Sequence, residues 1–177
     1  MLETERLILR QWKDSDKLPF IEMGMDHDVM KYLPNFLDEE QSVKLIQMAS
    51  EIINKNEWGI WAVELKDSHE FIGFIGLHNQ PTLFEFSPCV EIAWRLAKKY
   101  WGNGYATEGA KATLEYAFKT LQLNKVVSFT ATINEPSKSV MKKLGMTKVK
   151  EFNHPEFSLN KHLKKHVLYE IFNPYSK

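Results

Sequence analysis

Two glycines, Gly102 and Gly104, stand directly before a run of residues with helical spacing. Glycine lets the backbone turn sharply and approach a ligand closely, and the free N–H groups of a first helical turn point at whatever lies ahead of it. This combination favours an anion, above all a phosphate. The small and apolar face expected for the helix consists of Ala106, Ala110, Thr113, Leu114, Ala117, Phe118 and Leu121.

Single positions exclude two familiar phosphate-binding loops. A dinucleotide fingerprint requires a third glycine where this chain has Thr107. A nucleoside-triphosphate loop requires Lys and then Ser or Thr directly after its last glycine, but Ala110 follows Gly109 here. Two interpretations stay open: a pyrophosphate bound without a metal, or a strand-to-helix turn whose glycines serve packing alone.

Length and composition limit the classes of protein to consider. The 177 residues suit one domain, residues 1–177, with 44% hydrophobic and 26% charged residues. Lys plus Arg and Asp plus Glu each number 23, so no net field attracts nucleic acid or an anionic membrane. The lone Cys89 excludes an internal disulfide, and the N-terminus shows neither a signal peptide nor a spanning apolar run. We therefore expect a cytoplasmic protein with small or locally docked substrates.

Hydrophobic patterns place further elements around the glycine loop. Strands are expected at 6–12, 58–66, 70–79, 89–97, 125–132, 146–152 and 166–172. Helices are expected from the caps at 14–16 to about Met25, from the capping box of Asp38 and Gln41, after Gly104, and from Asn134 to Gly145. This order predicts an α+β fold in which helices flank a mixed, mostly antiparallel sheet of about six to seven strands.

Three runs of sequence, VEIAWRL, YWGNGYATEGA and NEPSKSVMKKLGM, resemble the coenzyme A site of the GNAT superfamily of N-acetyltransferases. The opening TERLILRQW and the spacing of later elements resemble its ribosomal-protein acetyltransferase-like (Rim-type) branch. The resemblance covers essentially the whole chain. It implies a GNAT-type fold with acetyl-CoA as cosubstrate, and it says much less about the acceptor.

The resemblance also implies positions for the coenzyme. The superfamily's Gln/Arg-x-x-Gly-x-Gly/Ala loop falls on Lys99, Gly102 and Gly104, although Lys99 lacks the bidentate fork of arginine. The end of the preceding strand would bind the pantetheine arm and the thioester carbonyl where two strands splay. The expected coenzyme-binding residues are Trp94, Leu96, Lys99, Gly102, Asn103, Gly104, Tyr105, Ala106, Asn134 and Ser137.

Acyl transfer from a thioester to an amine needs a neutral amine, a polarised carbonyl and a proton for the departing thiolate. Glu91 is the candidate base, and strand alternation places it on one face with Ala93 and Arg95. The alternative is an exposed strand carboxylate near Arg95. Asn134 and Ser137 match the branch's Asn-x-x-Ser motif, in which Ser137 would orient the sulfur, but both could equally be helix caps.

The acceptor is expected to be a primary amine, on a peptide N-terminus or a small molecule, that attacks directly in a ternary complex. Aromatic core is the default interpretation for each aromatic residue of this chain. Those that stand where relatives line the acceptor cleft are Tyr32, Phe36, Trp58, Trp61, the loop 84–86 and the region of His154.

Three further expectations complete the prediction. No metal is expected, because His166 opens a strand and so breaks its helical spacing from His162. The protein is expected to be a monomer or homodimer without nucleic-acid or membrane partners. The interpretation from another class is a non-catalytic acyl-CoA sensor or interaction module that retains the loop without turnover.

Overall fold

A computed structural model describes residues 1–157 and 160–176 and contains one eight-stranded sheet in the order β1-β2-β3-β4-β5-β6-β8-β7. The predicted α+β fold with a mixed sheet is confirmed, although the strand count exceeds the predicted six to seven. The additional strand is β1, two residues that pair with β2 at the edge of the sheet. The strands are β1 Leu2–Glu3, β2 Leu7–Arg10, β3 Ile60–Leu65, β4 Phe71–Gln80, β5 Cys89–Leu96, β6 Lys125–Ala131, β7 Thr147–Asn153 and β8 Lys165–Phe172.

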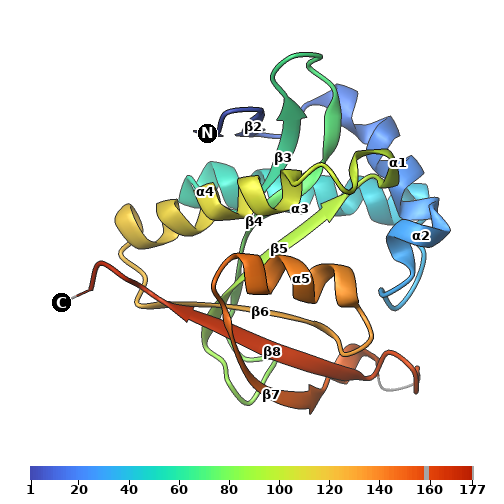
Figure 1. Cartoon of the computed structure of the whole chain (residues 1–177). Helices are drawn as coiled ribbons and strands as arrows, with labels where there is room; N and C mark the ends of the chain where they lie inside the picture. The colour runs from blue at the N-terminus through green and yellow to red at the C-terminus, as the bar shows by residue number, and fades with distance from the viewer. Residues whose placement is uncertain (158–159, 177) are drawn as a thin grey trace.

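The centre of the sheet departs from regular pairing. Neighbouring strands pair antiparallel except β5 and β6, which run parallel and pair at a single register position, Glu91 with Val127. Beyond that position the two strands diverge, as Figure 1 shows for β5 and β6. The sheet therefore opens at its middle into a wedge whose narrow end lies at Glu91.

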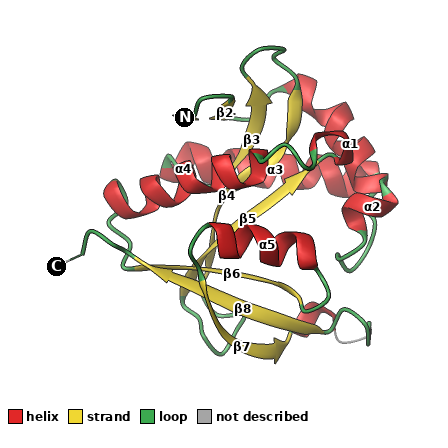
Figure 2. Ribbon diagram, viewed as in Figure 1, coloured by secondary structure: helices red, strands yellow, loops and turns green. Residues whose placement is uncertain are grey.

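Helices cover both faces of the sheet (Figure 2). The contacts place α1 and α3 together against β3 and β4, and place α4 and α5 against β4, β5 and β6. The helices are α1 Lys17–Met25, α2 His27–Met30, α3 Glu39–Asn56, α4 Tyr105–Lys119 and α5 Glu135–Lys143. None of the helices within the described ranges is long and apolar enough to cross a membrane.

Local sequence signals account for where these helices begin and end. Asp38 accepts a hydrogen bond from the Gln41 amide at 2.8 Å while the Gln41 side chain bonds the Asp38 amide, which confirms the predicted capping box of α3. Past the C-terminus of α5, Gly145 adopts φ +79°, a left-handed conformation that suits glycine.

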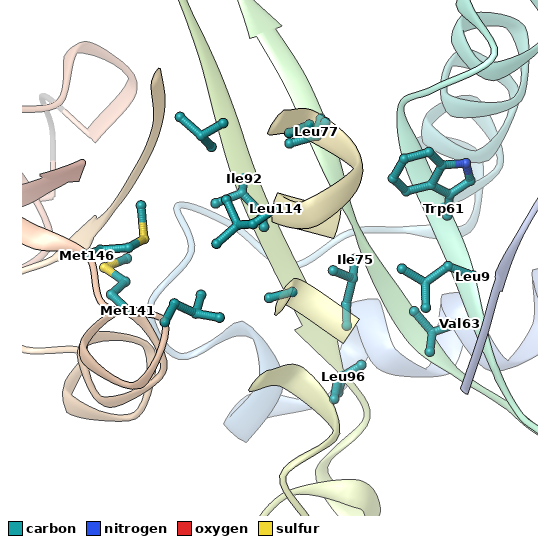
Figure 3. Close-up of a cluster of buried hydrophobic side chains, with 14 of the residues drawn as sticks. Leu9, Trp61, Val63, Ile75, Leu77, Ile92, Leu96, Leu114, Met141 and Met146 are labelled. Carbon is teal, nitrogen blue, oxygen red and sulfur yellow. The ribbon is translucent and has the colours of Figure 1, made fainter. Parts of the chain in front are cut away.

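The main core lies between α4 and the strands, as the labelled side chains of Figure 3 show. The predicted inner face of α4 is buried at Ala110, Thr113, Leu114, Ala117 and Phe118. Close packing also explains Gly109, because a Cβ added there would lie 2.4 Å from Ile75 Cδ1. This packing anchors α4 against the sheet and so fixes the glycine loop that precedes it.

Candidate functional site

A cavity of about 650 Å³ extends along the wedge between β5 and β6. Its walls come from β5, β6, α2, the glycine loop, the first turn of α4, and α5. Of the predicted site residues, those on its wall are Glu91, Trp94, Leu96, Gly102, Gly104, Tyr105, Ala106, Asn134 and Ser137. The fold thus gathers residues from three separate stretches of sequence around one space.

The glycine loop forms one end of this cavity. Gly102 and Gly104 have φ of +78° and +82°, and Gly104 is the N-cap of α4. The first helical hydrogen bond runs from the Glu108 amide to the Gly104 carbonyl at 3.0 Å, so the amides of Tyr105, Ala106 and Thr107 precede the helical ladder. Free amides at a helix N-terminus suit a pyrophosphate, and these residues therefore fit the phosphate end of coenzyme A.

Arg6 braces the start of α4 from outside the loop. Its Nη2 lies 2.6 Å from Glu108 Oε2, and its guanidinium carbon lies 4.5 Å from the centroid of the Tyr105 ring. Glu108 also accepts a hydrogen bond from the Thr4 hydroxyl at 2.6 Å. These contacts tie the first turn of the helix to the N-terminal segment of the chain.

Two predicted coenzyme residues lie apart from the cavity wall. Lys99 directs its Nζ toward Glu70 at 3.5 Å and lines a second pocket of about 910 Å³ together with Arg10 and Glu64. The Asn103 side chain donates to the carbonyls of Tyr100 and Trp101 at 3.2 and 3.1 Å, and so stabilises the loop itself. Roles for both residues in coenzyme binding remain predictions.

The backbone of Trp94 faces the open wedge. The Ala97 amide donates to the Ile72 carbonyl of β4. Counted back from Ala97, every second residue of β5 therefore forms backbone hydrogen bonds with β4, and the backbone groups of the residues between them point toward β6. In agreement, the Ile92 carbonyl accepts from the Ser128 hydroxyl of β6 at 3.0 Å, and the Leu96 carbonyl accepts from the Trp101 indole at 2.8 Å. Trp94 lies between them, where β6 has diverged, and its peptide groups can bond an extended amide ligand.

Glu91 occupies the narrow end of the wedge. Its side chain is only 12% exposed, so the alternative of an exposed strand carboxylate is wrong. Gln80 Nε2 donates to Glu91 Oε2 at 2.9 Å, and His78 Nδ1 lies 4.0 Å from the same oxygen. Burial raises the pKa of Glu91 to about 7, against the Gln80 hydrogen bond and with the help of the Glu156 charge. This carboxyl can therefore exchange a proton near neutral pH.

Asn134 and Ser137 form the cap of α5, as the structural interpretation of the motif predicted. Asn134 Oδ1 accepts from the Ser137 amide at 3.2 Å, and Asn134 Nδ2 donates to the Thr130 hydroxyl at 2.8 Å. Both residues also line the cavity. The cap fixes the position of Ser137 beside the wedge, so capping and a role in the site are compatible here.

The aromatic residues considered for the acceptor cleft divide into four groups. Trp61 is 1% exposed and packs edge-on against Tyr116, and Trp58 packs on the same core, so both belong to the core. Tyr32 lines the cavity, whereas Phe36 is 46% exposed and contacts His27. The loop aromatics Phe84 and Phe86 stack on each other and join a separate cluster with Phe129, Phe152 and His154.

Two residues near Glu91, His78 and Gln80, were missed by sequence reasoning. The β4–β5 register places His78 opposite Glu91, and Gln80 lies two residues further along the same face. Two polar residues at the end of an apolar strand could have indicated a site. Their proximity to Glu91 could not be predicted, because the loop between β4 and β5 is too long to set the strand register from sequence.

Comparisons with known proteins agree with this geometry. A family model for the acetyltransferase (GNAT) domain matches residues 6–147. The uncharacterized N-acetyltransferase YoaA of Bacillus subtilis (strain 168) is 31% identical over 150 residues, covering 84% of this chain and 83% of YoaA.

Solved structures extend the comparison to the fold. An acetyltransferase (GNAT family) from Bacillus anthracis has a TM-score of 0.82 at 28% identity and covers 97% of this chain and 98% of its own. A ribosomal-protein-S5-alanine acetyltransferase from Vibrio fischeri has a TM-score of 0.78 at 23% identity, covering 99% and 97%, which shows a shared fold alone.

Proposed function

This chain belongs to the GNAT family of acetyltransferases, and we propose on that premise that it acetylates a primary amine by direct attack within a ternary complex. It is an acetyl-CoA-dependent N-acetyltransferase. The observation that carries the proposal is the wedge between β5 and β6, with a glycine turn and a helix N-terminus at one end and a largely buried carboxyl of pKa about 7 at the other.

Acetyl-CoA supplies the activated thioester when it is bound. The amides of Gly102, Gly104 and the first turn of α4 bind its pyrophosphate, and the backbone of Trp94 binds its pantetheine arm. Ser137, held by Asn134, orients the sulfur; a hydroxyl is too weak an acid to be the main proton donor. With the coenzyme bound by these residues, Glu91 is the remaining titratable group that we place beside the acceptor amine.

Glu91 accepts the proton that the amine must lose, directly or through water. An α-amino group of pKa about 7.7–8.0 passes its proton to a base of pKa about 7 far more readily than a lysine of pKa about 10.4 does. The difference between the two amines, roughly 2.5 pKa units, corresponds to about 3.4 kcal/mol. A peptide N-terminus or a similarly acidic small-molecule amine therefore suits this base better than a lysine side chain.

We also propose that the chain belongs to the Rim-type branch of the family and that it is cytoplasmic. The Asn134-x-x-Ser137 motif supports the branch, and the single cysteine is consistent with a reducing compartment. The branch does not specify the acceptor.

Thermal denaturation with acetyl-CoA, coenzyme A, ATP and NAD in parallel tests the coenzyme site. A ligand that binds the native state at a hundredfold excess over its dissociation constant stabilises it by about 2.7 kcal/mol. We expect a shift with the two coenzymes only. Thiol release with a panel of amines then separates an enzyme from a non-catalytic acyl-CoA sensor, which would bind without releasing thiol.

A pair of glycine variants localises the coenzyme. Gly104→Val and Gly145→Val each force a side chain into a left-handed conformation, φ +82° and +79°, at a similar cost of about 1–2 kcal/mol. Gly145 stands at the end of α5, outside the cavity wall. Coenzyme affinity should therefore fall in Gly104→Val and persist in Gly145→Val, and equal losses would contradict the assignment of the loop.

A further inference from the structure

Arg95 is a charged residue in the cavity wall that the proposed reaction does not use. It lies on the same face of β5 as Glu91, and its guanidinium carbon is 5.2 Å from the ring centroid of its cross-strand neighbour Phe74. Its Nη1 atom is buried and has no hydrogen-bond acceptor within residues 1–157 and 160–176. Burial lowers the pKa of Arg95 to about 10, so the side chain remains charged at neutral pH.

The surroundings of Arg95 make this charge costly. Phe74 packs against the guanidinium, and the apolar residues Val29 and Leu33 line the same cavity. The cavity wall also holds the carboxylate of Asp28, which is paired with Lys98 at 2.5 Å. A partly buried cation without a counter-ion is destabilising, and an anionic ligand would supply the missing partner.

We propose that Arg95 binds an anionic group of the acceptor, so that the substrate is an amine that also carries a carboxylate remote from its nitrogen. This inference rests on the proposed function. It adds a substrate class, because a polyamine or an uncharged amine would leave the Arg95 guanidinium without a partner.

The direction of the side chain assigns the anion to the acceptor and not to the acyl group. Arg95 packs over its cross-strand neighbour Phe74 and shares one face of β5 with Glu91, the proposed base for the acceptor amine. The backbone that would bind the coenzyme arm faces the edge of β5 from which β6 diverges. An anion on the face of Glu91 and Arg95 is therefore assigned to the molecule whose amine Glu91 deprotonates.

The strand also sets the spacing between the two charges of the substrate. Glu91 and Arg95 are four residues apart, and a rise of about 3.3 Å per residue separates their Cα atoms by about 13 Å. An extended peptide covers that distance in about three to four residues. The best acceptors are therefore short peptides with a free C-terminus, or amines of comparable length ending in a carboxylate.

Matched peptides test the proposal directly. Glycine-based peptides of two to five residues, each as the free acid and as the C-terminal amide, are compared as acceptors at fixed acetyl-CoA. A charge-assisted hydrogen bond gives the acid a preference in kcat/KM of about 10- to 100-fold at the best length. Arg95→Gln should abolish this preference, and Arg95→Lys should retain part of it. Lys125→Gln, which removes an exposed cation that does not line the cavity, should leave it unchanged.

Each other outcome counts against the proposal in a distinct way. Equal rates for acid and amide in the wild type would refute the role of Arg95 while leaving acetyl transfer intact. A preference that survives in Arg95→Gln would assign the anion to another residue. Faster turnover of succinyl-CoA than acetyl-CoA, lost in Arg95→Gln, would place the anion on the acyl group instead.

A second measurement covers the case in which no amine is acetylated, which would contradict the proposed function itself. Thermal shifts with the same peptides in the presence of coenzyme A then test Arg95 alone. Stabilisation by acids but not amides, absent in Arg95→Gln, would support the site, and equal shifts would overturn it. The shift of Arg95→Gln with coenzyme A alone verifies that this variant is folded.

Discussion

Two regions of the sheet each hold an arginine and a glutamate, buried at β2 and β3 and partly buried in the cavity wall, and the two regions compensate these charges differently. At β2 and β3, Arg10 makes hydrogen bonds of 2.7 and 2.8 Å to the two Asp16 carboxylate oxygens and a third of 2.6 Å to Glu64. In the cavity wall of β5, Arg95 has a buried Nη1 without an acceptor in the described part of the chain. The same residue type is thus compensated in one place and not in the other.

The two glutamates differ in the same way. Burial opposes ionisation of Glu64, but hydrogen bonds from Lys13, Arg10 and His69 outweigh it and lower the pKa to about 2. Glu91 has one hydrogen-bond donor, Gln80, and burial raises its pKa to about 7. Arg10 and Glu64 in the first region are both charged and paired with each other. In the second region Glu91 can gain or lose a proton near neutral pH, and Arg95 is a cation that a substrate can pair with. Burial alone therefore does not distinguish a structural charge from a functional one; the partners do.

The largest effect is expected where compensation is complete. Arg10→Met leaves Asp16 buried without its bidentate partner, and breaking such a buried pair costs about 3–5 kcal/mol. Urea denaturation should show this loss in the free energy of unfolding. Lys17→Met is the control, since it removes an exposed ion pair with Asp14 and should leave the midpoint almost unchanged. A small loss in Arg10→Met would mean that the network contributes little to stability.

Glu91→Gln should slow acetyl transfer by at least a hundredfold, about 2.7 kcal/mol, because it removes the general base. The amide preserves the shape of the side chain, so the thermal shift with coenzyme A should stay as in the wild type. In the wild type, kcat/KM should rise with pH through about 7 as Glu91 loses its proton. A variant that transfers at the wild-type rate across pH would exclude Glu91 as the base.

The raised pKa of Glu91 also predicts how stability depends on pH. Between its ordinary pKa of 4.5 and about 7, the native state holds a proton that the unfolded chain has released. The contribution of this group to stability is therefore lost as pH rises through that window, by up to about 3 kcal/mol. Comparing unfolding free energies of wild type and Glu91→Gln at pH 5 and pH 8 isolates the effect, which should vanish in the variant.

Replacing the uncompensated arginine should have the smallest effect and the opposite sign. Arg95→Met removes a partly buried cation at the cost of its contact with Phe74, and a net gain of about 1 kcal/mol is expected. Thermal denaturation of Arg95→Met and Arg10→Met without ligand compares the two changes in stability. A loss of several kcal/mol in Arg95→Met would show that Arg95 stabilises the free protein, and it would remove the difference between the two regions.

Local signals were sufficient for most of the fold. The sharp turn at Gly102 and Gly104, the inner face of α4 and the capping box at Asp38 all depend on residues within a few positions of one another, and they were predicted correctly. Helix capping by Asn134 was one of the two interpretations that the sequence left open. The strand β1 was missed because two residues are too few to show a period. The sequence could not decide between acceptor cleft and aromatic core for Trp61, because its type suits either location and its burial depends on packing against Tyr116.

The properties of the residues in the cavity wall could be predicted from sequence only in part. Glu91 could be named from its place on a strand, but its pKa comes from burial, from Gln80 across the sheet and from Glu156 beyond β7. Lys99 could be named from the loop motif, yet the structure pairs it with Glu70. The missing counter-ion of Arg95 has no signature in the sequence at all, because a missing partner is known only after every neighbouring segment has been packed into place. Local backbone conformation and amphipathic pattern are determined by residues within a single segment, whereas the charge state of a buried group is determined by the segments that pack around it.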